Sequence, residues 1–132
     1  MTDYPLTVVT ARPMGRALWR GFRCRCPNCG EGKLYRTFLK VVDRCAVCDT
    51  DLTPQRADDA PAYMTIFIVG HVIVSGVMAT EFVGPDLPFW IPALVWSAIA
   101  VGLSLLLLPR VKGALVGLQW ANRMHGFGGV AD

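Results

Sequence analysis

The sequence predicts a membrane all-α fold, in which a two-helix transmembrane hairpin follows a small cysteine-containing β ribbon. Three observations predict it. Hydrophobic residues make up 53% of the 132 residues and charged residues only 17%, against about 25% charged in average soluble chains. Ten of the thirteen Lys and Arg residues precede residue 57 and the other three follow residue 109, so the apolar middle carries none. All five cysteines precede that middle. This composition excludes a disordered chain and a large soluble enzyme.

Two apolar segments, residues 62–83 and 88–108, form the predicted hairpin. Each meets the requirement of about 20 mostly apolar residues for a bilayer-spanning helix, and each is apolar around its whole circumference. The four residues between them begin with a Gly-Pro turn signal and are too few to form a domain. A hairpin buried in a larger soluble protein is the alternative, but the rest of the chain is too small to bury it.

The distribution of basic residues also predicts orientation and location. The loop between the segments has no Lys or Arg, while both flanks carry them, so the positive-inside rule places both ends of the chain in the cytoplasm. The first twenty residues show no signal peptide, and we expect the first span to act as the insertion signal. The lipid bilayer is therefore the first predicted partner of this multi-pass chain.

Four of the cysteines are spaced as metal ligands. Cys26 and Cys29 are followed, after fifteen residues, by Cys45 and Cys48, which matches the C-x₂-C-x₁₅₋₂₀-C-x₂-C pattern of a zinc site. Two tight turns of this kind present four sulfurs to one ion at about 2.3 Å each. Because thiolates fill all four positions, the sequence predicts a structural rather than a catalytic Zn²⁺. Residues 33–42 between the pairs are predicted to form strand, and metal binding is expected to supply the folding energy of this zinc ribbon.

Cysteines in this pattern have other uses. Disulfides suit an extracellular domain, whereas the predicted orientation places the thiols in a reducing compartment. A thioredoxin-like redox pair requires a βαβ surround that the sequence lacks. Copper and iron–sulfur sites share the thiolate chemistry, and the spacing leaves them open. We expect no role for Cys24; the alternative is an exchange of ligands between Cys24 and Cys26.

His71 lies near the middle of the first predicted span, where an ionisable side chain is costly and is a candidate for function. Two interpretations stay open. A neutral His71 hydrogen-bonds a neighbouring helix, or it is a cofactor-binding residue that contacts a haem, quinone or metal shared with a partner. Glu81 lies ten residues further on, about 15 Å along the helix, and is expected to be a solvated carboxylate near the outer interface.

The chain is therefore divided into a basic N-terminal arm (1–23), the ribbon (24–52), a linker (53–61), the hairpin (62–108) and a cytoplasmic amphipathic tail (109–132). The arm has arginines at positions 12, 16 and 20, and either rests on anionic lipid or is loosely ordered. The tail suits a helix at the cytoplasmic interface of the membrane. Alternatively, its Gly113 and Gly117, four residues apart, dock against another helix.

Several motifs together resemble a known bacterial family, the domain of unknown function 983. They are CPNCGEGKLYRTFLKVVDRCAVC at 26–48, DAPA at 59–62, VGHV at 69–72 and PRVKG at 109–113. The resemblance covers roughly residues 20 to 122 and departs from the family pattern after Cys48, where Asp49 replaces the usual glycine. The resemblance implies a small bacterial inner-membrane protein with no established activity, often encoded beside cytochrome oxidase subunits and their assembly factors.

Three classes of function follow. The leading one is a non-enzymatic accessory or assembly protein of a respiratory membrane complex, with the zinc ribbon as its cytoplasmic docking module. The second is a thiolate-based handler of copper or electrons for a respiratory partner. The third is a membrane-tethered nucleic-acid binder, against which the acidic residues after the ribbon argue by repelling a polyanion. The sequence shows no nucleophile–base pair, no open metal site and no small-molecule substrate, so we predict that the chain is not an enzyme.

Overall fold

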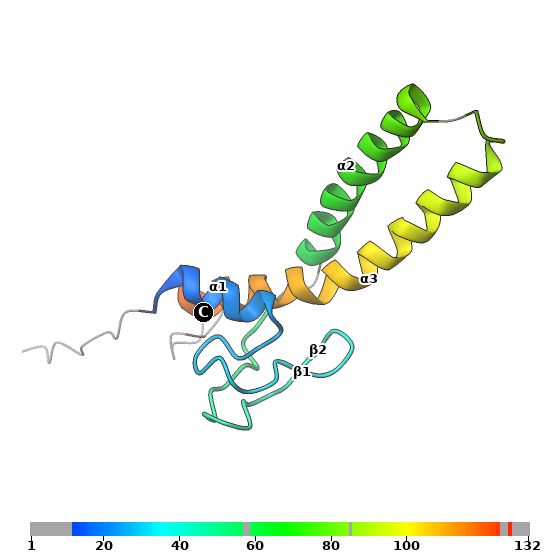
Figure 1. Ribbon diagram of the computed structural model, residues 1–132. Helices are drawn as coiled ribbons and strands as arrows, with labels where there is room; N and C mark the ends of the chain where they lie inside the picture. The colour runs from blue at the N-terminus through cyan, green and yellow to red at the C-terminus, as the bar shows by residue number, and fades with distance from the viewer. Residues whose placement is uncertain (1–11, 57–58, 85, 125–126, 128–132) are drawn as a thin grey trace, which may run out of the picture.

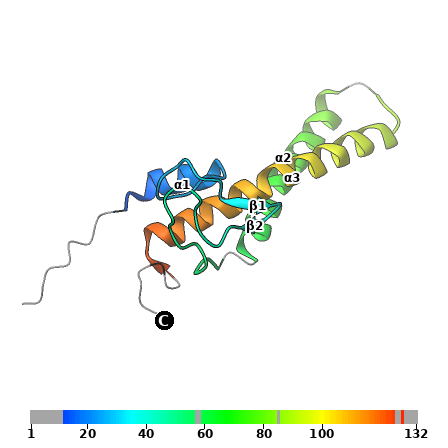
Figure 2. The same ribbon diagram turned by 90° about the horizontal axis from the view of Figure 1, so that it is seen from below.

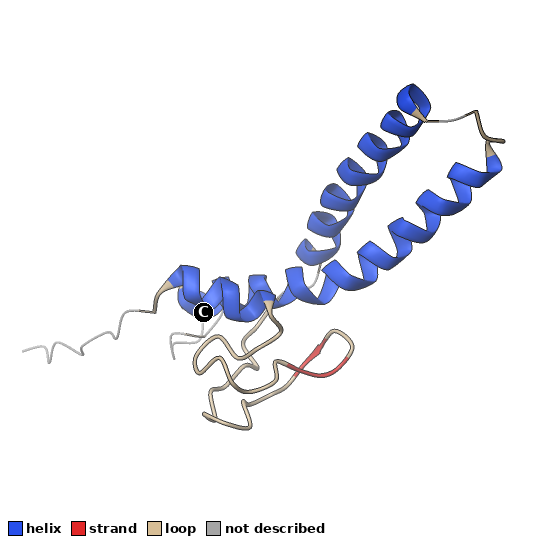
Figure 3. Ribbon diagram, in the orientation of Figure 1, coloured by secondary structure: helices blue, strands red, loops and turns tan. Residues whose placement is uncertain are grey.

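The computed structural model describes residues 12–56, 59–84, 86–124 and 127. Its elements run in the order α1 (Met14–Phe22), β1 (Tyr35–Thr37), β2 (Lys40–Val41), α2 (Ala60–Val83) and α3 (Trp90–Ala121). The two short strands pair in antiparallel fashion, and two long helices follow them (Figure 1; Figure 3). The predicted fold class, a small β ribbon followed by a two-helix hairpin, is confirmed.

Helices α2 and α3 are both long and apolar enough to cross a membrane. Their apolar side chains point outward: Ile66 is 68% exposed, Phe82 79% and Leu94 66%. The core helix of a soluble protein buries such side chains, and soluble monomers rarely expose an apolar surface of this extent. The exposure therefore favours lipid as the surrounding medium over a soluble hairpin, and the chain is a membrane protein with two candidate spans.

The two spans meet where a glycine makes room for an aromatic ring. A Cβ atom added at Gly76 of α2 would overlap the ring of Trp96 on α3. Small residues allow close helix approach in lipid in this way. Not every small residue serves this contact, since a Cβ added at Gly102 would meet no atom within 4 Å.

Helix α3 is longer than the predicted second span. The sequence suggested a span ending at 108 and a separate tail from 109, whereas the helix continues through Pro109 to Ala121. A proline inside a helix removes one hydrogen bond and kinks the chain without necessarily ending the helix. Figure 1 shows α3 changing direction in this region, so that its C-terminal part leaves the line of the hairpin.

Helix α1 packs in antiparallel fashion on this C-terminal part of α3 (Figure 1; Figure 2). A Cβ added at Gly113 would overlap the carbonyl oxygen of Gly21, and one added at Gly117 would overlap that of Ala17. The predicted docking of the Gly113 and Gly117 pair against another helix thus occurs within the chain. The part of the N-terminal arm that the structure describes is accordingly a packed helix rather than a loosely ordered segment, because its backbone fits against these glycines.

The ribbon shares its core with α1 and α3. Leu34 and Leu52 of the ribbon are fully buried against Ala17, Val116 and Trp120, and Phe127 joins the same cluster. The tail was expected to rest its apolar face on the membrane surface, but that face is covered by the ribbon. The sequence pattern of an amphipathic helix is the same in both cases, because it records an apolar stripe and not the identity of what covers it.

Polar contacts fix the ribbon and the linker after it to three positions along α3. The Tyr35 hydroxyl donates to the carbonyl oxygen of Pro109 at 2.6 Å, and Lys112 Nζ donates to the Leu39 carbonyl at 2.7 Å. The Gln119 side chain accepts from the backbone N–H of Arg56 at 2.8 Å and donates to the Arg56 carbonyl at 2.7 Å. These bonds hold the ribbon beside the point where α3 leaves the apolar hairpin.

Candidate metal centre

The four cysteines predicted as metal ligands converge in the ribbon. Sγ atoms of Cys26, Cys29, Cys45 and Cys48 all lie within 4.8 Å of one another. The sulfurs of Cys26 and Cys48 are 3.7 Å apart, and those of Cys29 and Cys45 are 3.6 Å apart. Zn–S bonds of about 2.3 Å separate the sulfurs of a tetrahedron by about 3.8 Å, so these two pairs already have the spacing that one four-coordinate ion requires. The four cysteines are thus positioned to bind a metal ion.

Two turns of equal construction present the sulfurs. In the first turn, the N–H of Gly30 donates to the Cys26 carbonyl at 2.9 Å, and Gly30 has φ +73°. In the second, the N–H of Asp49 donates to the Cys45 carbonyl at 2.9 Å, and Asp49 has φ +59°. Asp is among the few non-glycine residues that enter this left-handed region, since its short polar side chain bonds locally. The departure from the family pattern at Asp49 therefore leaves the turn geometry intact.

The positive φ at position 49 lets us predict how substitutions there affect metal binding. Asp49→Gly should preserve metal binding, because glycine adopts this conformation freely and the exposed ion pair that Asp49 forms with Arg44, at 3.4 Å, contributes little. Asp49→Val should destabilise the ribbon by about 1–2 kcal/mol, since a β-branched residue is strained there. Competition with a metal chelator measures both. Equal metal retention by the two variants would contradict this account of the second turn.

Backbone N–H groups point at two of the sulfurs. Gly32 N donates to Cys29 Sγ at 3.5 Å, and Val47 N donates to Cys45 Sγ at 3.4 Å. Gly32 also has to be a glycine, because a Cβ there would overlap Cys45 Sγ.

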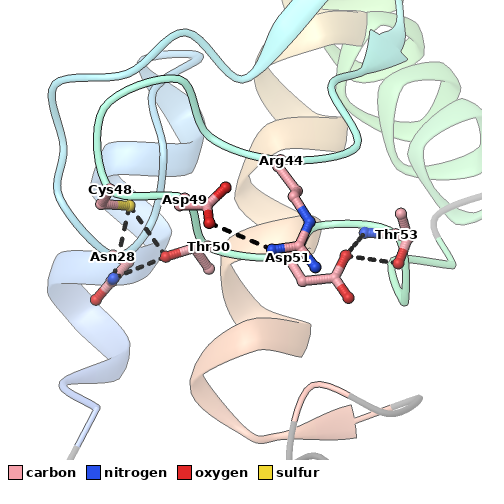
Figure 4. Close-up of polar contacts among 7 residues, drawn as sticks. All are labelled: Asn28, Arg44, Cys48, Asp49, Thr50, Asp51 and Thr53. Atoms are coloured by element: carbon pink, nitrogen blue, oxygen red, sulfur yellow. Dashed lines mark hydrogen bonds and ion pairs between the residues drawn. The ribbon is translucent and has the colours of Figure 1, made fainter.

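Cys48 has side-chain partners that sequence reasoning missed. The Thr50 hydroxyl lies 3.0 Å from Cys48 Sγ, and Asn28 Nδ2 lies 3.6 Å from that sulfur and 2.8 Å from the Thr50 hydroxyl oxygen (Figure 4). Asn28 is inside the first Cys-x-x-Cys and Thr50 is two residues beyond the second. Their proximity to a cysteine was visible in the sequence, but their contact across the two turns was not.

These surroundings shift the pKa values of two ligands in opposite directions. Burial raises the pKa of the Cys26 thiol to about 12. Burial also opposes ionisation of Cys48, but hydrogen bonds from the hydroxyl and backbone of Thr50 outweigh it and lower the pKa of Cys48 to about 6. A metal bound at neutral pH therefore displaces a proton from Cys26.

The centre is closed. Cys26 is 0% and Cys45 2% exposed, while Cys29 and Cys48 are half-buried. Four sulfur donors around one ion leave no position for water or substrate, which is the arrangement of structural rather than catalytic sites. The side chain of Cys24 is not among the four; this residue follows α1 with φ +60°. The suggested exchange of Cys24 with Cys26 stays a prediction.

His71 lies outside the metal centre. Its Nδ1 is 2.8 Å from the carbonyl oxygen of Phe67, one turn earlier in α2, and its ring lies 4.3 Å from that of Phe67. The side chain is exposed, together with its neighbours on the outer face of the helix. Among the described residues, the contacts of His71 are therefore with its own helix. Its role as a cofactor-binding residue for a partner stays a prediction.

Fold and site together define a class: a membrane protein with two candidate spans and a four-cysteine metal centre packed on the extension of the second. The family described as Protein of unknown function (DUF983) matches residues 35–120, well over half of the chain, and the chain belongs to this family. That range contains β1, β2, the second cysteine pair, the whole of α2 and all of α3 except its last residue. No curated protein and no solved structure matches the chain.

Proposed function

We propose that this chain is a small, non-enzymatic accessory or assembly protein of the bacterial inner membrane, linked to a respiratory cytochrome oxidase complex. The metal-centred ribbon is its cytoplasmic docking module. The closed four-sulfur centre carries the proposal, because an ion held there supports the shape of a surface and has no open position at which to react. The respiratory link comes from the family resemblance and is the part that a partner search must test.

The metal is proposed to be Zn²⁺. Tetrahedral sites with four sulfur donors suit zinc or iron–sulfur chemistry, and zinc needs no change of oxidation state to hold a fold. Transfer of copper or electrons, the second candidate function, requires sulfur that a partner reaches. The near-complete burial of Cys26 and Cys45 favours the structural role.

The distribution of charge supports a cytoplasmic ribbon. The basic residues that the structure describes lie at the end of the molecule that carries the metal centre, whereas the loop end carries Glu81 and Asp86. The positive-inside rule then assigns the ribbon, α1 and the end of α3 to the cytoplasm. Acidic side chains on the ribbon, among them Asp49 with 78% of its side chain exposed, argue against a nucleic-acid partner.

Purification of the full-length chain from its native membranes in mild detergent tests this function. We expect oxidase subunits among the co-purifying proteins with the wild type and with Cys24→Ser, and their loss with Cys45→Ser. Co-purification of the same proteins with all three chains would contradict docking through the ribbon. Stoichiometric copper in the purified protein would support the handler function, and enriched nucleic acid would support the third candidate.

A further inference from the structure

A cavity of about 350 Å³ lies between α1 and the metal-binding ribbon, and arginines dominate its wall. We call it the arginine pocket. Its lining includes Arg12, Arg16, Arg20, Asn28, Thr50 and Trp120. None of the residues that line it, among those that the structure describes, is acidic. Three cationic side chains thus share one cavity without a carboxylate.

The three arginines converge because of their spacing. Residues four apart fall on the same side of a helix, and Arg16 and Arg20 are separated by one turn of α1. Arg12 lies just before the helix, and its guanidinium is 4.5 Å from the ring of Trp120, which also lines the pocket. All three arginines therefore line the same cavity.

Two of the three arginines, Arg12 and Arg20, are held in place by hydrogen bonds that use only some of their N–H donors. Arg12 Nη1 donates to the carbonyl oxygens of Trp120 at 2.7 Å and Phe127 at 3.2 Å. Arg20 Nη1 donates to the Asn28 carbonyl at 2.6 Å. A guanidinium has five N–H donors, so both side chains are held in place while further donors stay available.

Arg16 differs from its neighbours. Its side chain is exposed, and it makes no hydrogen bond or ion pair with any residue in the described part of the chain. It is therefore the arginine whose replacement changes the pocket's charge with the smallest effect on the fold.

The positive charges of the pocket favour the binding of an anion. Burial and the nearby charge of Arg123 lower the pKa of Arg12, as expected for a cation held among like charges. Bringing like charges together costs free energy, and a bound anion offsets that cost. Phosphate oxygens accept paired N–H bonds from a guanidinium fork, and a doubly charged phosphate matches several forks better than a single carboxylate does.

We propose that the arginine pocket is a binding site for a phosphate group, carried either by an anionic lipid headgroup or by a free phosphate compound. The volume is in the range of small-molecule sites. The site goes beyond the proposed accessory function and does not depend on a respiratory partner.

The pocket is adjacent to the metal centre. Asn28 and Thr50, which line the pocket, both have side-chain contacts with Cys48 Sγ. A phosphate bound against these side chains alters the hydrogen bonding of one metal ligand. The absorption spectrum of Co²⁺ placed in the centre is therefore expected to shift when the pocket fills.

The test uses the full chain loaded with Co²⁺ in phosphatidylcholine nanodiscs, which carry no net lipid charge. One arm titrates inorganic phosphate and follows binding calorimetrically and by the Co²⁺ spectrum. The other arm adds phosphatidylglycerol to the nanodiscs and counts retained lipids by native mass spectrometry. Arg16→Gln is compared with Arg36→Gln, which removes the same charge from an exposed position on β1.

We expect Arg16→Gln to weaken binding by about tenfold, the effect of losing one charge-assisted hydrogen bond, and Arg36→Gln to bind as the wild type does. Saturable binding of inorganic phosphate identifies a free phosphate compound. Retention of phosphatidylglycerol without phosphate binding identifies a lipid headgroup. The proposal is overturned if neither ligand binds, or if the two variants lose binding equally.

Discussion

Cys26→Ser is expected to abolish metal binding by the purified chain and to unfold the ribbon. Structural zinc contributes about 10–16 kcal/mol of apparent binding free energy in small zinc domains at neutral pH, which is as large as the whole stability of a typical domain, about 5–15 kcal/mol. Cys26 is fully buried beside the other three sulfurs, so a serine there removes a ligand and leaves a hydroxyl in its place. Metal content and hydrogen exchange of the ribbon measure the two effects.

The matched control is Cys24→Ser, which replaces a neighbouring half-buried cysteine that is not part of the cluster. It should retain one metal per chain and the wild-type exchange pattern in residues 24–52. A Cys26→Ser chain that kept both the metal and the protection would show that the four-cysteine centre does not hold the ribbon together. The apolar hairpin should insert in the membrane in all three proteins, because its spans do not contain the metal ligands.

The second large effect is expected at Gly113, where α1 and α3 are in backbone contact. A Cβ added there would overlap the carbonyl oxygen of Gly21 and press on Leu34 of the ribbon core, so Gly113→Ala must push the two helices apart. Overpacking of this kind lowers the free energy of unfolding by about 1–3 kcal/mol. The better helix propensity of alanine returns about 1 kcal/mol, so the net loss for Gly113→Ala is at most about 2 kcal/mol. Gly113→Leu should lower the free energy of unfolding further, because its larger side chain has no space between the two helices.

Thermal unfolding of the detergent-solubilised protein checks this, since each kcal/mol shifts the Tm of a small domain by about 4–8 °C. Gly15→Ala is the control, because a Cβ at that position of α1 meets no atom within 4 Å. It should leave the Tm unchanged or slightly raised. If Gly113→Leu unfolded at the same temperature as Gly15→Ala, α1 would not be packed on α3 as described.

The cysteine cluster and the hairpin could be predicted from the sequence, for different reasons. The C-x₂-C spacing repeats a local geometry, so the separation of Cys26 from Cys29 and of Cys45 from Cys48 already limits where the sulfurs lie. The spans were readable because a bilayer demands a long apolar run that few other environments require. Both signals are local, and neither depends on knowing what else the chain folds against.

The packing of the ribbon on α1 and α3 was not readable. The contact between α1 and α3 beneath the ribbon brings together Ala17 and Gly117, one hundred positions apart, and the sequence records only that each side is small or apolar. The amphipathic pattern after Pro109 predicted a surface of some kind, and the membrane was the nearest candidate. The structure assigns that surface to Leu34 and Leu52 instead. Side-chain partners of Cys48 were hidden for the same reason.

X-ray absorption spectroscopy of the purified full-length protein tests the central claim most directly. One zinc per chain, surrounded by four sulfur atoms at about 2.3 Å with no oxygen or nitrogen ligand, is the result expected from the four converging cysteines. A metal bound through oxygen or nitrogen, or a folded ribbon that contains no metal, would contradict the assignment of a closed structural centre.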